Sequence, residues 1–234
     1  MSKTLIIPDV HGRAFWREAV AKKSYERIVF LGDYLDPYPH EGITQRHAYE
    51  GLLDIIDLKL QQPERVVLLL GNHDLHYYSA AYGRIAKGSR YNANYAWKYK
   101  KCFVQHRNLF QLAYEEEHNG IRYLFTHAGI TQGWYEQHKN IIGELNAPNL
   151  NHLLDSLQGI ETLTKISFFR GGDSMWGSCI WTDIAEIAVS IPFDNIYQVF
   201  GHSQSEKPYI SPDWACLDCR KSFILQDSEI KTVE

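Results

Sequence analysis

The sequence predicts an α/β fold. Five short aliphatic segments have the pattern of buried strands, helical patterns lie between them, and every strand segment stops abruptly at polar residues. The segments are TLIIPDVHG, RIVFLGDYLD, RVVLLLGNHD, IRYLFTHAG and IYQVFGHSQ. Alternation of short apolar strands with helices is typical of a sheet covered by helices.

The helices are expected where apolar residues recur at spacings of three and four. This pattern predicts helices at residues 13–22 and 43–60, and shorter ones at 149–157 and 162–169. Near the end of the chain, WACLD and SFILQ have the pattern of closing strands at an antiparallel edge.

The length of 234 residues favours one domain over residues 1–234, with one substantial core. A net charge of −4 predicts solubility, and no stretch approaches membrane-spanning length. The N-terminal apolar run is too short for a signal peptide. Four cysteines without an export signal fit a reducing compartment, so we expect a cytoplasmic protein with no membrane partner.

A basic, tyrosine-rich segment at about 75–118 is expected to be helical. No acid occurs between Leu75 and Tyr114, and the segment holds seven positive charges at Arg84, Lys87, Arg90, Lys98, Lys100, Lys101 and Arg107. Because it follows GNHD directly, it should leave the edge of the sheet that carries the polar residues. It is either a solvated helical face or a means of attracting a phosphorylated ligand.

The polar residues at the strand ends form a set that can bind metal ions. A single Asp or His in such a place is more often a cap or a hydrogen-bonded structural group. Together the ends supply three imidazoles, two carboxylates and one amide, from Asp9, His11, Asp33, Asn72, His127 and His202. Two carboxylates buried side by side need compensating positive charge, which two divalent cations would provide. Nitrogen and oxygen ligands without thiolate suit Mn²⁺, Fe or Zn²⁺.

The ordered series PDVHG, GDYLD, GNHD, THAG and GHS, at positions 8–203, resembles the calcineurin-like metallophosphoesterase superfamily. In motif style it is closest to the serine/threonine protein phosphatase and diadenosine-tetraphosphatase branch. The resemblance implies two mixed β-sheets packed as a sandwich and flanked by helices, the αββα architecture. Matched by position, Asp9, His11 and Asp33 would hold one metal ion, and Asp33, Asn72, His127 and His202 the other.

The resemblance also implies a reaction. A hydroxide bridging the two metal ions would attack a phosphomonoester. Mn²⁺ is the expected metal, with Fe or Zn²⁺ as alternatives. His73 would be the general acid that protonates the leaving alkoxide, and Asp36 would orient it. Gly71 is expected to leave room for the tight turn before these residues.

The pattern departs from that of its relatives at one metal ligand and at the groups that bind phosphate. Many phosphodiesterases and nucleases have a second histidine where this chain has Gln204, so the first metal ion should have one protein ligand fewer. The phosphatase branch has an arginine after GDxxD and another before GNH, where this chain has Pro37 and Leu70. Arg13, Arg90 and Arg170 are the candidate substrate-binding replacements, although each taken singly also fits a surface or capping role.

The sequence is therefore compatible with three functions. The first is hydrolysis of phosphomonoesters, with a phosphoprotein, a nucleotide or a dinucleoside polyphosphate as substrate. The second is a phosphodiesterase or nuclease on the same dinuclear site, which the basic segment favours and Gln204 opposes, so a nucleic-acid partner is not favoured. The third is a non-catalytic scaffold with this fold, which the presence of all six ligands and His73 opposes.

Overall fold

The computed structural model describes residues 3–22, 25–85 and 90–233. The chain divides into two compact units, the first made of residues up to 111 together with those from 220 onward, and the second of residues 112–219. Each unit has its own β-sheet and its own helices. Among the described residues, no helix combines the length and the apolar character that crossing a membrane would require.

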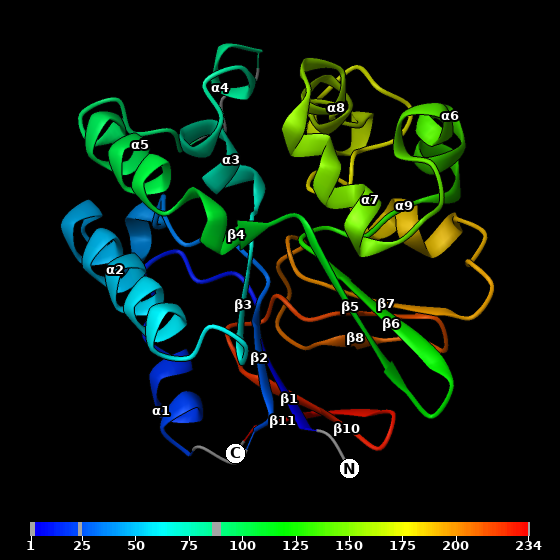
Figure 1. Ribbon diagram of the computed structural model, residues 1–234, viewed down its shortest axis with the longest axis horizontal. Helices are drawn as coiled ribbons and strands as arrows, with labels where there is room; N and C mark the ends of the chain where they lie inside the picture. Colours follow the sequence, from blue (N-terminus) through cyan, green and yellow to red (C-terminus); the bar gives the residue numbers. More distant parts are fainter. Residues whose placement is uncertain (1–2, 23–24, 86–89, 234) are drawn as a thin grey trace. The chain divides into compact units, whose positions relative to one another are not determined.

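The sheet of the first unit joins both ends of the chain, in the order β11-β10-β1-β2-β3-β4. Four strands run parallel: β1 (Lys3–Ile7), β2 (Arg27–Phe30), β3 (Val66–Leu69) and β4 (Phe110–Gln111). β10 (Phe223–Gln226) lies antiparallel beside β1 and is followed by β11 (Glu229–Thr232), the red strands next to the blue one in Figure 1. β3 is buried along its whole length, as its uninterrupted aliphatic sequence requires.

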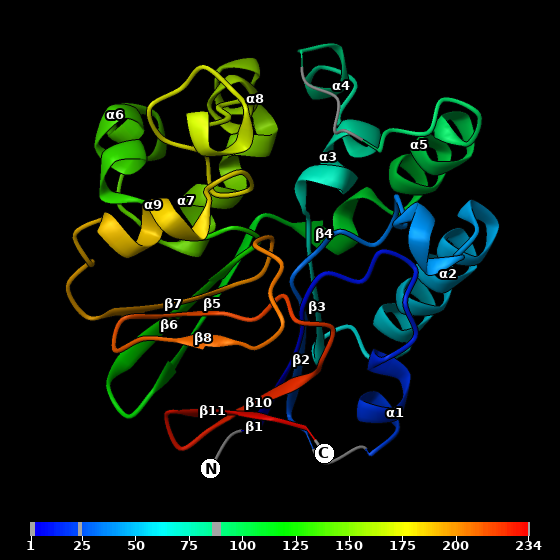
Figure 2. The same ribbon diagram turned by 180° about the vertical axis from the view of Figure 1, so that it is seen from behind.

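The helices of the first unit follow the predicted pattern. They are α1 (Trp16–Ala21), η1 (Pro39–Glu41), α2 (Gln45–Gln61), α3 (Asn72–Tyr78), α4 (Tyr82–Ile85), α5 (Ala96–Gln105) and η2 (Arg107–Leu109). α1 and α2 lie together on one side of the sheet in both Figure 1 and Figure 2. The hydroxyl of Thr44 caps α2 by accepting the His47 N–H at 3.1 Å. The predicted helices at 13–22 and 43–60 are confirmed.

The second unit is built on a five-stranded sheet in the order β5-β6-β7-β9-β8. Its strands are β5 (Ala113–His118), β6 (Ile121–Thr126), β7 (Ile196–Phe200), β8 (Tyr209–Ile210) and β9 (Trp214–Cys216). β6, β7 and β9 run parallel, whereas β5 and β8 are antiparallel edges. The helices α6 (Gln132–Ile142), α7 (Ala147–Asn151), η3 (His152–Asp155), α8 (Leu157–Leu163), η4 (Phe168–Arg170) and α9 (Ile184–Val189) gather on one side of this sheet (Figure 2).

The α/β class with two mixed sheets and flanking helices is confirmed, and each of the five aliphatic segments contains a strand. The packing of the sheets as a sandwich and the single domain over residues 1–234 stay predictions. WACLD and SFILQ do not form one edge, because β9 pairs parallel with β7 and β10 pairs with β1 in the other sheet. The helix expected at 162–169 is wrong, since α8 ends at Leu163 and Ser167 bridges to Ser174 instead.

The basic segment is only partly helical. Its described part contains most of α3, then α4, α5 and η2, but from Phe110 onward the chain forms β4 and β5. Residues 113–118 leave the helical pattern because they pair antiparallel with β6 along the full length of the strand. Residues 86–89, which include Lys87, lie outside the described residues.

Candidate active site

The loops after β1 and β2 are joined backbone to backbone. The N–H of His11 donates to the carbonyl of Asp33 at 2.6 Å, and the N–H of Gly12 donates to that of Tyr34 at 3.0 Å. Parallel neighbouring strands end at the same edge of a sheet, so their loops can meet in this way. Ligand atoms of Asp9, His11 and Asp33 lie within 4.8 Å of one another, and each side chain is no more than 2 % exposed. The structure therefore brings these predicted ligands together.

Three residues of these loops have an unusual backbone. The φ angles are 44° at His11, 53° at Asp33 and 54° at Asp36, all in the left-handed region that favours glycine. Such a conformation costs on the order of 1–3 kcal/mol per residue and persists only where the surroundings impose it. Strain of this kind concentrates at functional sites.

His11 is held in the form that binds a metal ion. Its Nδ1 lies 2.8 Å from the carbonyl oxygen of Leu35, which can only accept, so Nδ1 carries the proton and Nε2 keeps its lone pair. Burial lowers the pKa of His11 to about 3, although the charge of Asp33 opposes this shift. A neutral imidazole with a directed lone pair beside two carboxylates fits a divalent cation.

Asp33 is fixed by the turn that follows β3. Its Oδ1 accepts the N–H of His73 at 2.9 Å, and a Cβ at Gly71 would lie only 2.1 Å from this oxygen. Gly71 itself has an extended backbone, with φ −93° and ψ 177°. Glycine is therefore needed at this position to leave room, and the group that needs the room is Asp33.

Asp74 ties the two turns together. Its carboxylate accepts backbone N–H groups of Asp33 at 2.7 Å, Gly71 at 2.9 Å and Tyr34 at 3.0 Å. The sequence interpretation missed this residue. Its signal was an acid three residues after the glycine that precedes α3, the position from which a side chain reaches back to the start of a helix.

Asp36 follows β2, and its carboxylate is hydrogen-bonded to three side chains of α3. Its Oδ2 lies 3.0 Å from Nδ1 of His73 and 2.9 Å from Nε2 of His76, and its Oδ1 accepts the Tyr77 hydroxyl at 2.6 Å. Burial raises the pKa of Asp36, but the hydrogen bonds with His73 and His76 outweigh it, so the pKa lies below its ordinary value. Asp36 is therefore a carboxylate that can hold His73 in one orientation.

His76 and Tyr77 were not among the predicted site residues. They follow His73 by three and four positions, so all three side chains lie on one face of α3. This spacing was the available signal. His76 is fully buried, and burial lowers its pKa against the opposing effect of Asp36, so it supports Asp36 from the protein interior.

Two of the three candidate arginines lie beside the strand ends of the first unit. Arg13 makes a two-point contact with the Glu41 carboxylate, at 2.8 Å from Nε and 2.9 Å from Nη2, and donates from Nη1 to the carbonyl of Asp9 at 3.2 Å. Arg90 donates from Nε to the carbonyl of Asp36 at 2.9 Å, and its Nη2 lies 3.3 Å from Nε2 of His11.

In the second unit, His127 and His202 follow the parallel strands β6 and β7. Nε2 of His127 lies 3.2 Å from Nδ1 of His202. Two imidazole nitrogens that bind one ion at about 2.1 Å and at right angles would be roughly 3 Å apart, so this spacing fits a shared cation. Arg170, the third candidate, contacts the carbonyl of His202 at 3.4 Å and the Ser203 hydroxyl at 2.6 Å, and it pairs with Asp183 at 2.8 Å.

The donor set agrees with the chemistry expected of a divalent metal site. The candidate groups among the described residues contain only His and Asp, and the four cysteines are free and buried. Asn72, 1 % exposed, is the first residue of α3 and comes directly before His73. The approach of the residues of the first unit to His127 and His202 stays a prediction.

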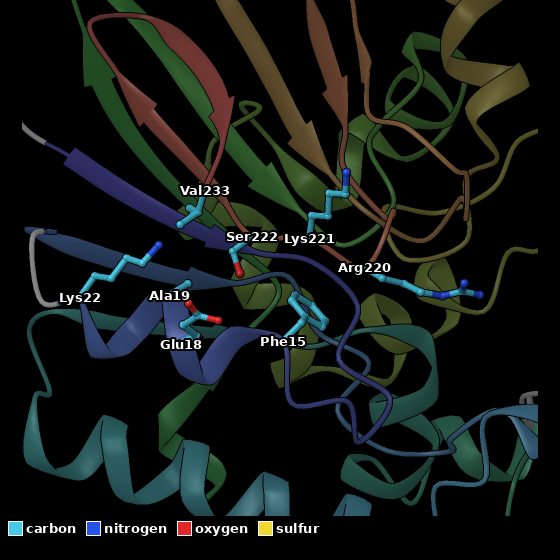
Figure 3. Close-up of a pocket in the computed structure, with 8 residues that line it drawn as sticks. All are labelled: Phe15, Glu18, Ala19, Lys22, Arg220, Lys221, Ser222 and Val233. Atoms are coloured by element: carbon cyan, nitrogen blue, oxygen red, sulfur yellow. The ribbon is translucent and has the colours of Figure 1, made fainter.

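A cavity of about 190 Å³ in the first unit is separate from these residues. It lies between α1 and residues 220–222, where Glu18 and Ala19 face Ser222 (Figure 3). None of the predicted ligands, nor His73 or Asp36, is among its lining residues. It is therefore not the predicted site.

Known proteins resemble this chain in sequence and in fold. The sequence model for calcineurin-like phosphoesterases matches residues 2–228. The catalytic subunit of serine/threonine-protein phosphatase 4 from Kluyveromyces lactis is 30% identical over 99 residues, which are 40% of this chain and 30% of that protein. The chain spans less than a third of the length of the curated relatives it matches.

Two solved structures show the same fold. A mutant of a cold-active protein tyrosine phosphatase has a TM-score of 0.61 at 14% identity, over 100% of this chain and 81% of that one. A serine/threonine phosphatase from Saccharomyces cerevisiae, described as similar to human phosphatase PP5, has a TM-score of 0.53 at 14% identity, over 100% and 80%.

Proposed function

Because this chain belongs to the calcineurin-like phosphoesterase family, we propose that it is a metal-dependent hydrolase of phosphomonoesters. One observation carries the proposal. The Asp9, His11 and Asp33 group and the His73 and Asp36 pair occupy adjoining turns of the first unit, linked by the hydrogen bond from the His73 N–H to Asp33 at 2.9 Å. A cation-binding group next to an oriented imidazole is what hydrolysis of a phosphate ester needs.

The proposed metal ligands are the six polar residues that follow the strand ends. Asp9, His11 and Asp33 would hold one ion, and Asp33 with Asn72, His127 and His202 would hold the other. Two divalent cations bound there would neutralise the phosphoryl oxygens and activate the attacking water. Nitrogen and oxygen donors without thiolate favour Mn²⁺, and Fe or Zn²⁺ would suit the same donors.

His73 is proposed to protonate the leaving oxygen. Its Nδ1 faces Asp36 at 3.0 Å, and this supports a tautomer in which Nδ1 donates to the carboxylate. When the ring is protonated, Nε2 also carries a proton that can pass to the departing alkoxide. Asp36 stabilises the imidazolium and fixes its direction, which restricts the transfer to a group on the open side of the ring.

The proposed substrates are phosphoproteins, nucleotides or dinucleoside polyphosphates. The curated relatives named as serine/threonine phosphatases support the first of these. Gln204, in place of a second histidine, argues for monoesters against the alternative of a phosphodiesterase or nuclease. The free, buried cysteines support the proposed cytoplasmic location, where thiols stay reduced.

The test is the ratio of hydrolysis rates for p-nitrophenyl phosphate and bis(p-nitrophenyl) phosphate in excess Mn²⁺. We expect a clear preference for the monoester. A preference for the diester would replace this proposal with the phosphodiesterase alternative, and salt-sensitive binding of single-stranded DNA would then support a nuclease. Hydrolysis of neither ester by metal-loaded protein would favour the scaffold.

A further inference from the structure

We propose that Arg90 binds the phosphoryl group of the substrate, in place of the two arginines that this chain lacks, and that it is available to do so when a metal ion occupies His11. The inference rests on the proposed function and names the residue that recognises its substrate. It also selects one of three candidate arginines on the basis of their contacts.

The side chain of Arg90 is already held in place. Its Nε donates to the carbonyl of Asp36 at 2.9 Å, and its Cζ lies 3.7 Å from the ring centroid of Tyr38. A guanidinium on an aromatic face is stabilised by cation–π attraction. These two anchors restrict the rotamers before any ligand binds, so little side-chain entropy is left to lose on binding. These two contacts use the Nε–H and one face of the guanidinium. The N–H groups of Nη1 and Nη2 are not part of either contact and can donate to a ligand.

The other two arginines are committed to carboxylates. Arg13 is paired with Glu41 through two nitrogens, and Arg170 with Asp183 at 2.8 Å. In contrast, no carboxylate of residues 3–22, 25–85 and 90–233 forms an ion pair with Arg90. Of the three candidate arginines, Arg90 is therefore the one whose positive charge an anionic ligand would neutralise.

The contact between Arg90 and His11 links this arginine to the metal site. Nη2 lies 3.3 Å from Nε2 of His11, the nitrogen that keeps its lone pair because Nδ1 faces Leu35. One lone pair cannot accept from Arg90 and bind a metal ion at the same time. A metal ion bound to His11 would therefore end this contact and leave Nη2 of Arg90 available beside the site.

The consequence is a coupling between the ion and the substrate phosphate. Two neighbouring positive charges repel each other, but an anion between them is attracted by both. Arg90 should oppose metal binding when no anion is present and favour it when phosphate is bound, and by reciprocity the ion should favour phosphate. The preferred ligand is a dianionic phosphoryl group, as in a phosphomonoester or inorganic phosphate, because a diester carries one negative charge fewer.

The experiment is calorimetric titration of inorganic phosphate into Mn²⁺-loaded protein. Arg90→Ala should weaken phosphate binding by about tenfold or more, the effect of losing a hydrogen bond to a charged group. Arg90→Lys should fall between this variant and the wild type, because it keeps the charge and loses the planar fork. Arg84→Ala is the control, since Arg84 is exposed in the same basic segment and its Nε donates to the carbonyl of Ala80 at 3.2 Å.

A second titration, of Mn²⁺ into metal-free protein, tests the coupling. Without phosphate, Arg90→Ala should bind Mn²⁺ as tightly as the wild type or more tightly. Added phosphate should raise Mn²⁺ affinity in the wild type and raise it less in Arg90→Ala. Weaker Mn²⁺ binding by Arg90→Ala without phosphate would overturn the coupling.

The outcomes separate this inference from the proposed function. Unchanged phosphate affinity in Arg90→Ala, an equal loss in Arg84→Ala, or a wild type that binds no phosphate would each overturn the role of Arg90. Ester hydrolysis by the wild type would leave the proposed function standing in the first two cases. Phosphate binding that depends on Arg90, in a protein that hydrolyses no ester, would instead support this inference and remove the proposed function.

Discussion

Asp33 is the residue on which most of the proposed site depends. Its Oδ1 accepts the His73 N–H at 2.9 Å, and its Oδ2 lies 3.4 Å from Nε2 of His11. Asp33→Asn keeps the shape of the side chain but removes the negative charge that the two cations would share. We expect Mn²⁺ content and hydrolysis to be lost together, with kcat/KM reduced by at least about 100-fold. Elemental analysis of the purified variant measures the metal.

The control for this change is Asp54→Asn, a half-exposed carboxylate paired with Arg17 on the surface of the first unit. It should leave both metal content and activity unchanged, because an exposed ion pair contributes little. Full metal occupancy in Asp33→Asn would contradict its place between two ions.

His73 has a separable role at the same scale. His73→Asn should retain Mn²⁺, because the proposed ligands are unchanged, and should lower kcat on an alkyl phosphate by about 10²–10⁴-fold. The loss on p-nitrophenyl phosphate should be much smaller, since nitrophenolate leaves without a proton. Rates for both substrates with one preparation provide the comparison, and an alkyl phosphate turned over at the wild-type rate rules out the acid role.

At the scale of elements, α3 positions the proposed acid through several side chains of one face. Tyr77 donates to Asp36 at 2.6 Å and accepts the N–H of Asn92 at 2.7 Å. Tyr77→Phe removes both contacts, so Asp36 should hold His73 less firmly. We expect kcat on an alkyl phosphate to fall by about threefold to tenfold, with less effect on p-nitrophenyl phosphate.

The neighbouring Tyr78→Phe is the matched control. Its hydroxyl donates to the carbonyl of Arg107 at 3.5 Å, whereas the described side chains that hydrogen-bond the Asp36 carboxylate are His73, His76 and Tyr77. It should retain wild-type kcat on both substrates. Equal losses in the two variants would mean that α3 is generally destabilised and that Tyr77 has no positioning role.

The turn between β3 and α3 gives a prediction about stability. An added methyl at Gly71 would meet Oδ1 of Asp33 at 2.1 Å, whereas one at Gly51 on α2 would meet nothing within 4 Å. Gly71→Ala should lower the free energy of unfolding by about 1–3 kcal/mol and weaken Mn²⁺ binding. Gly51→Ala should be neutral or raise it by about 0.5–1 kcal/mol. Urea denaturation measures both, and equal stability of Gly71→Ala and wild type would contradict the crowding at Asp33.

For the whole molecule, the predictable features were those set by local pattern. Aliphatic runs gave the strands, and the ends of parallel strands gathered Asp9, His11 and Asp33 in the first unit. The contacts of Asp74 with Asp33 and Tyr34, and of Arg90 with His11, were not predictable, because they depend on how far a side chain reaches across the fold. Arg90 and His11 are 79 positions apart in the sequence. The helix expected at 162–169 failed because backbone hydrogen bonds of residues 166–174 close a loop there.

The central claim is that the chain binds two metal ions through the proposed ligands Asp9, His11, Asp33, Asn72, His127 and His202. The most direct test removes all metal with a chelator and then adds Mn²⁺ stepwise while hydrolysis of p-nitrophenyl phosphate is followed. We predict no activity in metal-free protein and a plateau near two ions per chain. Undiminished hydrolysis after chelation, or failure to bind any Mn²⁺, would contradict it.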